Sequence, residues 1–176
     1  MDLIGLLRTA RGFQHIAEAN TSRRAPVKRP VDLFDEVVTH RGLATASREL
    51  FADGHYTRAV EQGFKAVNSV VKKRTGFAAE GRPLMERAFS PSKPKLAINA
   101  LETRTETDEQ TGTMMLFAGA MAAIRNVRTH DLERQDNPQT ALELLAFANY
   151  LIRVAEAATV RSGRAAVVHS TNGKPA

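Results

Sequence analysis

Apolar residues recur at helical spacing along most of this chain. Between residues 55 and 75 they follow one another at intervals of three or four positions, at Tyr56, Val60, Phe64, Val67 and Val71. Such a stripe is typical of an amphipathic helix with one buried face. The basic residues at 72–74 suit the negative end of a helix, and Gly76 stands where a glycine cap ends one. The pattern predicts a helix over 55–75.

Two further segments predict long helices by the same reasoning. One covers about residues 112–125 and the other about residues 138–159, with Pro138 in the first turn, where proline is favoured. Shorter helical pieces are expected at 33–38 and 43–51. No segment alternates polar and apolar residues for long enough to predict a strand.

The expected fold class is all-α, with an antiparallel four-helix bundle as its core. The expected core helices lie at 42–53, 55–75, 112–125 and 138–159. Residues 89–112 are polar and contain two prolines, so we expect an irregular, surface-exposed connection there. The methionines at positions 114, 115 and 121 are expected to fill the core.

The length of 176 residues fits one domain with two peripheral additions. We expect the helical domain at 31–160. Residues 1–30 are expected to form an N-terminal amphipathic helix and a basic linker, and residues 161–176 a disordered tail.

Composition and charge narrow the class of protein. The chain has no cysteine, which excludes disulfides, thiolate zinc sites and cysteine nucleophiles. The longest apolar run, at 114–124, is about half as long as a membrane span. We therefore expect a cytoplasmic protein without a membrane partner. A net charge of +6, with 18 arginines against 7 lysines, fits an acidic partner such as nucleic acid and equally fits a solvated basic surface.

The segment "RNVRTH", at 125–130, follows the most apolar part of the chain. An arginine followed by a histidine after four to six residues occurs four times, at Arg8–His15, Arg48–His55, Arg125–His130 and Arg164–His169. Because chance alone gives one or two such pairs, the spacing carries little weight by itself. Only Arg125–His130 closes an expected core helix and precedes another across a short connection.

The sequence around this pair resembles a known family. The segments "LFADGHYTRAVEQGFKAVNSVV", "GRPLMERAFSP", "LFAGAMAAIRNVRTHD" and "ALELLAFANYLIRVAE" are similar to the C-terminal domain of the bacterial and archaeal Ymh family, assigned to the HEPN superfamily. The similarity covers roughly residues 31–157. HEPN proteins are small helical bundles, and many are metal-independent ribonucleases with this arginine–histidine motif. Members often have proline after Arg-Asn, whereas this chain has Val127, so nothing forces Asn126 out of helical geometry.

The resemblance implies a metal-independent endoribonuclease of HEPN type, used as a toxin or in abortive infection against phage. It would act through the ribose 2′-OH and leave 2′,3′-cyclic phosphate and 5′-OH ends. His130 would be the general base or acid, Arg125 would stabilise the charge on phosphorus, and Asn126 would position the phosphate or the histidine ring. No metal and no cofactor is expected.

The partners follow from the geometry and from the resemblance. In a straight α-helix, side chains five positions apart point roughly 140° apart. Arg125 and His130 therefore converge only if the helix breaks or tightens between them, or if two subunits share one cleft. The resemblance implies the second arrangement, a homodimer with a composite active site. RNA is the expected substrate, and an antitoxin or defence-system protein is a further candidate partner.

Four charged residues near the motif are supporting candidates: Glu61, Lys65, Arg128 and Asp131. Arg128 is interpreted as an RNA-backbone contact. Glu61 either orients the motif or forms an ordinary surface ion pair with Lys65. Arg125 could instead pair with Asp131 or Glu61, and His130 could cap helix carbonyls.

Two other functions compete with the ribonuclease. The first is a catalytically inactive HEPN-like module that binds RNA, nucleotide or a protein partner. The second is a DNA-binding regulator, which the sequence favours less because the helix at 55–75 has its basic residues at one end only.

Overall fold

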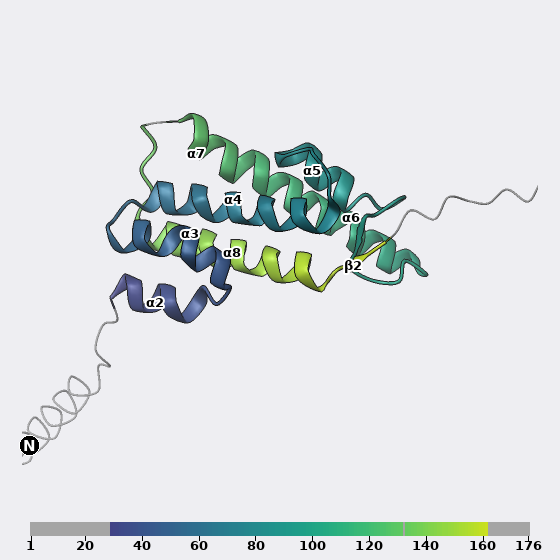
Figure 1. Ribbon diagram of the computed structural model, residues 1–176, viewed down its shortest axis with the longest axis horizontal. Coiled ribbons are helices and arrows are strands. Elements are labelled where there is room, and N and C mark those ends of the chain that lie inside the picture. Colours follow the sequence, from purple (N-terminus) through teal and green to yellow (C-terminus); the bar gives the residue numbers. More distant parts are fainter. Residues whose placement is uncertain (1–28, 132, 162–176) are drawn as a thin grey trace, which may run out of the picture.

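The computed structural model describes residues 29–131 and 133–161, and helices make up most of them (Figure 1). The helices are α2 (Pro30–Val37), α3 (Arg41–Ala52), α4 (Tyr56–Thr75), α5 (Gly81–Ala88), α6 (Arg104–Gly119), the π-helix η1 (Ala120–Asn126), α7 (Val127–His130) and α8 (Pro138–Ala157). The predicted all-α class is confirmed. The predicted N-terminal helix and the predicted tail after residue 161 lie outside the described residues.

Helix α4 is the centre of the bundle. It packs against α3 and α8 on one side and against η1, α7 and α5 on the other (Figure 1). The apolar stripe predicted for this helix is buried except for Tyr56, which is partly buried. The end of the helix follows the prediction, since Gly76 adopts the left-handed conformation with a φ of 71°. The close approach of α8 depends on Gly63, because a Cβ atom there would lie 2.5 Å from Cδ2 of Leu145.

The helix that carries the motif is longer than predicted. Helices α6, η1 and α7 follow one another without a gap from Arg104 to His130. The first turns of α6 are polar and have no apolar stripe, so the hydrophobic pattern does not reveal them. Their start is marked instead by a capping box, in which Thr103 and Glu106 each accept a hydrogen bond from the other's backbone N–H.

The expected irregular connection over residues 89–112 is found only up to residue 103, and even there it is partly buried rather than fully exposed. Residues from 104 onward are helical, and the preceding part contains a strand, β1 (Leu96–Ala97), which pairs antiparallel with β2 (Thr159–Val160). The buried Gln110 holds this part in place. Its side chain donates to the carbonyls of Phe89 and Leu96, at 2.8 and 3.1 Å, and accepts from the N–H of Ile98 at 3.0 Å.

Helices α2 and α3 close the bundle against α8. The backbone N–H of His40 donates to Oδ1 of the buried Asn149 at 2.9 Å, which ties the start of α3 to α8. Phe34 of α2 packs against Phe51 of α3, with ring centroids 5.1 Å apart and the rings tilted by 39°. Across the described ranges, no helix is both long and apolar enough to cross a membrane.

Candidate functional site

Arg125 and Asn126 are the last residues of the π-helix η1, and α7 continues directly to His130. The backbone of Asn126 and Val127 is helical, with φ/ψ of −62°/−41° and −58°/−46°. The helix therefore neither breaks nor tightens between Arg125 and His130; its widened turns include Arg125 and end at Asn126. π-Helical turns are rare and occur often at functional sites.

The half-buried guanidinium of Arg125 lies beside the first residue of α5. Its Nη1 atom is 3.5 Å from the position that a Cβ atom would take on Gly81, and its Nε is buried without an acceptor among the described residues. Glu80 and Lys72 are close by, joined by a 2.6 Å hydrogen bond. This bond and the charge of Lys72 lower the pKa of Glu80, and Arg125 adds a smaller attraction. The Arg125 side chain thus has no carboxylate bonded to it.

The other two motif residues, Asn126 and His130, have exposed side chains. Neither side chain makes a hydrogen bond or ion pair to any described residue. His130 therefore does not cap the helix carbonyls of the described residues, which was the alternative considered from the sequence. Asp131 is also exposed, and its Oδ1 accepts from the N–H of Glu133 at 3.2 Å. It does not pair with Arg125.

Glu61 contacts the motif helix through Thr129, a residue that the sequence analysis did not single out. The Thr129 hydroxyl lies 3.0 Å from the carbonyl oxygen of Arg125 and 3.3 Å from Oε1 of Glu61. Glu61 also pairs with Lys65 at 2.8 Å, which is the ordinary helix-surface ion pair that the spacing allowed. The bond of a helical threonine to the carbonyl four residues earlier is common, and other threonines of this chain make it, so no sequence signal singles out Thr129.

The structure does not leave Arg128 free to contact an RNA backbone. Its Nε and Nη2 atoms each lie 2.7 Å from a carboxylate oxygen of Asp136, and the two side chains are only 2% and 3% exposed. A third donor, Nη1, reaches the carbonyl of Ile124 at 3.2 Å. Burial and pairing together correct the interpretation of Arg128: its role is to hold α7 to the chain before α8.

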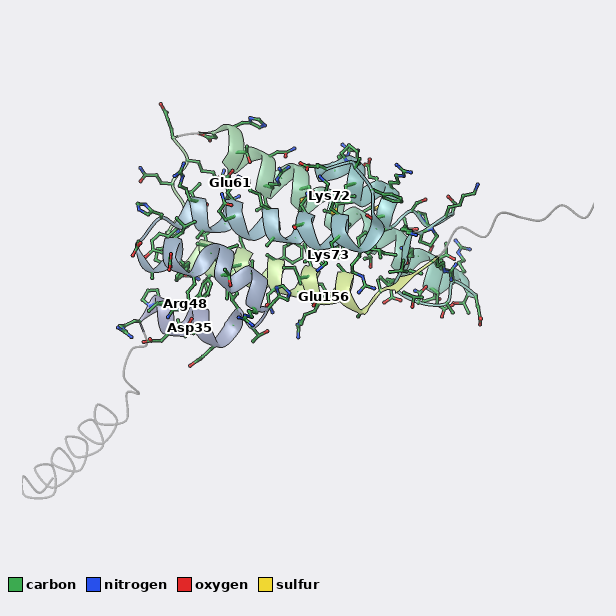
Figure 2. The ribbon with its side chains drawn as sticks, in the orientation of Figure 1. Asp35, Arg48, Glu61, Lys72, Lys73 and Glu156 are labelled. Atoms are coloured by element: carbon green, nitrogen blue, oxygen red, sulfur yellow. The ribbon has the colours of Figure 1, made fainter. Side chains whose placement is uncertain are left out.

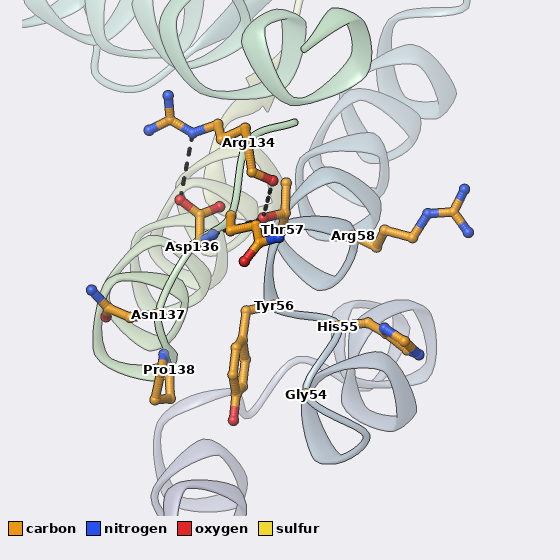
Figure 3. Close-up of a pocket in the computed structure, with 10 residues that line it drawn as sticks. Gly54, His55, Tyr56, Thr57, Arg58, Arg134, Asp136, Asn137 and Pro138 are labelled. Carbon is orange, nitrogen blue, oxygen red and sulfur yellow. Dashed lines mark hydrogen bonds and ion pairs between the residues drawn. The ribbon is translucent and has the colours of Figure 1, made fainter. Parts of the chain in front are cut away.

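A pocket of about 500 Å³ lies next to Asp136, between the starts of α4 and α8 (Figure 3). The Thr57 hydroxyl bridges this region, since it donates to the carbonyl of Arg134 at 3.1 Å and accepts from the N–H of Asp136 at 2.8 Å. Figure 3 shows the side chains of Arg58 and Arg134 pointing in different directions. The pocket therefore does not gather its positive charges at one point.

Within one chain, the site is spread along the surface of η1 and α7. Arg125 lies beside Gly81, whose N–H donates to Asn68 at 2.8 Å, whereas Thr129 contacts Glu61, about two turns earlier on α4. No hydrogen bond joins Arg125 to His130. In the part of the chain that the structure describes, no group of three or more His, Asp or Glu side chains could hold a metal ion.

Comparison with known proteins gives a family and no characterised relative. The model of a family described as "Protein of unknown function (Hypoth_ymh)" matches residues 38–154, which is more than half of the chain and includes the whole motif. No curated protein and no solved structure matches the chain. The resemblance seen in the sequence is thereby confirmed at the level of the family: the chain belongs to Hypoth_ymh, a family of unknown function.

Proposed function

We propose that this protein is a metal-independent endoribonuclease of HEPN type, with Arg125, Asn126 and His130 as its catalytic residues. The observation that carries the proposal is the state of Arg125. Its guanidinium is half-buried, is bonded to no carboxylate and keeps one buried donor without an acceptor among the described residues. Buried donors normally have partners, so a phosphate oxygen is a suitable acceptor to complete this one.

The chemistry uses groups that the site supplies. His130 takes the proton of a ribose 2′-OH, and the 2′-oxygen attacks phosphorus. The bond to the 5′-oxygen breaks as that oxygen receives the proton back from the protonated His130. Arg125 donates hydrogen bonds to the non-bridging phosphate oxygens as negative charge accumulates on them. Asn126, which is exposed one residue away, positions the scissile phosphate. The products are a 2′,3′-cyclic phosphate and a 5′-OH.

Because Arg125 and His130 do not meet within one chain, we propose that a second copy of the chain brings a second motif next to the first. Exposed positions recur every three or four residues along α6, η1 and α7, and they form an outer face made of Met115, Leu116, Gly119, Ala123, Asn126 and His130. Met115 and Leu116 are 62% and 50% exposed, and no charged residue occurs between positions 114 and 124. Exposed apolar surface beside small residues favours a close helix contact. A two-fold contact through Met115, Leu116, Gly119 and Ala123 would bury that part of the face and leave both motifs in one cleft beside it.

The decisive experiment uses the full-length protein and mixed RNA with EDTA present. Wild-type protein should cleave, and the Arg125→Ala and His130→Ala variants should each lose about 10²-fold or more of the rate. Matched controls are Arg82→Ala, which removes an exposed arginine on α5, and His55→Ala, which removes an exposed histidine before α4. Both controls should keep full activity. Equal cleavage by all five proteins would mean a contaminating nuclease and would reject the proposal.

A catalytically inactive RNA-, nucleotide- or protein-binding module is the alternative, and the absence of any bond between Arg125 and His130 in one chain favours it. RNA binding by the wild type without cleavage would decide for this alternative. For the cellular role we propose a cytoplasmic toxin or abortive-infection effector, on the strength of the resemblance to HEPN proteins. Induced expression of the wild type should then arrest bacterial growth, whereas expression of His130→Ala should not.

A further inference from the structure

A second pocket is lined by residues from the start of α3, the last turns of α4 and the end of α8. Figure 1 shows that α3 and α8 lie on the side of α4 opposite α7. The volume of this pocket, about 690 Å³, is in the range of small-molecule sites. Six of its lining residues carry polar or charged side chains: His40, Arg41, Thr45, Lys73, Arg74 and Glu156. The motif residues take no part in it.

Three cations of this pocket have no carboxylate partner among the described residues. Arg41 and Lys73 are exposed and form no ion pair there. Arg74 donates through Nη1 and Nη2 to the backbone carbonyls of Glu156 and Ala158, while its Nε is buried without an acceptor. Backbone carbonyls satisfy hydrogen bonds but do not neutralise the charge. The pocket therefore favours an anionic ligand with more than one negative oxygen.

The start of α3 adds backbone N–H donors to the lining of this pocket. Arg41 and Gly42 are the first two residues of this twelve-residue helix, so their N–H groups have no carbonyl partner within it. The third N–H, that of Leu43, is already taken by Nδ1 of His40 at 3.1 Å. The two amides at the positive end of the helix thus belong to residues that line the same pocket as Lys73, an arrangement suited to phosphate.

Glu156 adds a carboxylate, which is a hydrogen-bond acceptor, to the cations of this pocket. Its Oε1 lies 3.2 Å from Nε2 of His40, and it lines the pocket from α8 while Lys73 lines it from α4; Figure 2 labels both side chains. A carboxylate repels a bare phosphate but accepts hydrogen bonds from hydroxyl groups. The hydroxyl of Thr45, which makes no hydrogen bond to a described residue, can bind hydroxyls as well.

We infer that this pocket binds a sugar phosphate. Arg41, Lys73 and the first amides of α3 hold the phosphate, and Glu156 and Thr45 bind the sugar hydroxyls. The inference is independent of the proposed ribonuclease, because no residue of the motif lines this pocket.

Calorimetric titration of the full-length protein with ribose 5-phosphate tests the inference. Binding should be saturable, and Arg41→Ala and Lys73→Ala should each weaken it about tenfold or more, as expected for the loss of a charge-assisted hydrogen bond. Arg104→Ala removes an equal charge from an exposed position on α6 and should leave the affinity unchanged. Arg125→Ala should also leave it unchanged, which separates this pocket from the proposed RNA site.

Matched ligands test which part of the molecule is recognised. Inorganic phosphate should bind more weakly than ribose 5-phosphate, and ribose without phosphate should not bind. Equal affinity for inorganic phosphate would reject the assignment of the sugar. No saturable binding up to about 10 mM ribose 5-phosphate, or the same loss in Arg104→Ala as in Lys73→Ala, would reject the site. RNA cleavage should be unaffected by Lys73→Ala, so failure here and failure of the proposed function are distinguishable.

Discussion

Arg128 and Asp136 form a buried, bidentate ion pair, with two nitrogen–oxygen distances of 2.7 Å. The pair joins α7, which ends at His130, to the chain two residues before α8. It therefore fixes the end of the motif helix relative to the bundle. A buried pair of this kind is strongly destabilising to break from one side, because the remaining charge has no water to solvate it.

Asp136→Asn should lower the free energy of unfolding by about 3 kcal/mol or more, because it leaves the buried guanidinium of Arg128 without its carboxylate. The measurement is urea denaturation followed by circular dichroism. The matched control is Asp108→Asn, which removes an exposed carboxylate 3.9 Å from Arg104 and should cost less than about 0.5 kcal/mol. A similar small loss from both variants would contradict a structural role for Arg128.

Gly63→Ala should destabilise the protein by about 1–3 kcal/mol, because the added methyl group meets Leu145 at 2.5 Å and Leu43 at 3.2 Å inside the core. Gly112→Ala is the matched control: it lies within α6, and an added Cβ has no neighbour within 4 Å. It should stabilise the protein by about 0.5–1 kcal/mol. Thermal unfolding of both variants checks the pair, and a stabilised Gly63→Ala would show that α4 and α8 are not in close contact.

Stability should depend on pH through Glu106 at the start of α6. Its carboxylate accepts from the backbone N–H groups of Thr103 and Glu102, at 3.0 and 2.8 Å, and these bonds lower its pKa. A lowered pKa in the folded state means that this stabilisation is present above the ordinary glutamate pKa of about 4.3 and is lost as the pH falls through the lower folded value.

Wild-type protein should therefore lose more stability than Glu106→Gln between about pH 6 and pH 3. Urea midpoints at several pH values give the comparison. Glu102→Gln serves as the control, since the Glu102 side chain makes no hydrogen bond to a described residue and its removal should leave the pH dependence as in the wild type. A Glu106→Gln variant with the wild-type pH profile would contradict the capping role.

Met115→Asp should convert the proposed dimer to a monomer and abolish RNA cleavage while the helical circular dichroism remains unchanged. The reason is that a charge on the outer face of α6 cannot be buried against a second copy without a large desolvation cost. Sedimentation velocity measures the change. Val37→Asp, at another exposed apolar position, should remain dimeric and active. A monomeric wild type at micromolar concentration would reject the composite cleft.

The spacing of apolar residues predicted those helices of the bundle that bury one face. It did not predict helical segments that lack such a face. The stripes of α4 and α8 were visible because those helices bury one side against several neighbours. The first half of α6 is polar, and only the Thr103–Glu106 capping pattern indicates where it starts. For Met115 the expectation of core filling is wrong, since that side chain is 62% exposed, whereas Met121 is fully buried. Both methionines look alike in sequence because hydrophobicity does not say which side of a helix is covered.

The candidate site was located by sequence, but the separate roles of its charges were not. Arg125 and Arg128 lie three positions apart, and only their surroundings distinguish a guanidinium bonded to no carboxylate from a buried, paired one. Asp136, the carboxylate that pairs with Arg128, lies beyond the helix in the connection that follows it. No local sequence pattern links these two residues. The contact between Thr129 and Glu61 likewise depends on how α7 lies along α4.

The π-helix η1 has a consequence for how insertions and deletions would act on this protein. A π-turn closes its hydrogen bonds over one residue more than an α-turn, so a chain one residue shorter over Ala120–Asn126 could continue as a regular α-helix. The two helices would keep nearly the same relative rotation, because the wide turn already accommodates the extra residue. Arg128 would keep its bond to Asp136, and the same side of α6 would face outward. The same deletion earlier in α6, where no π-turn absorbs it, would instead turn the preceding residues by about 100° about the helix axis.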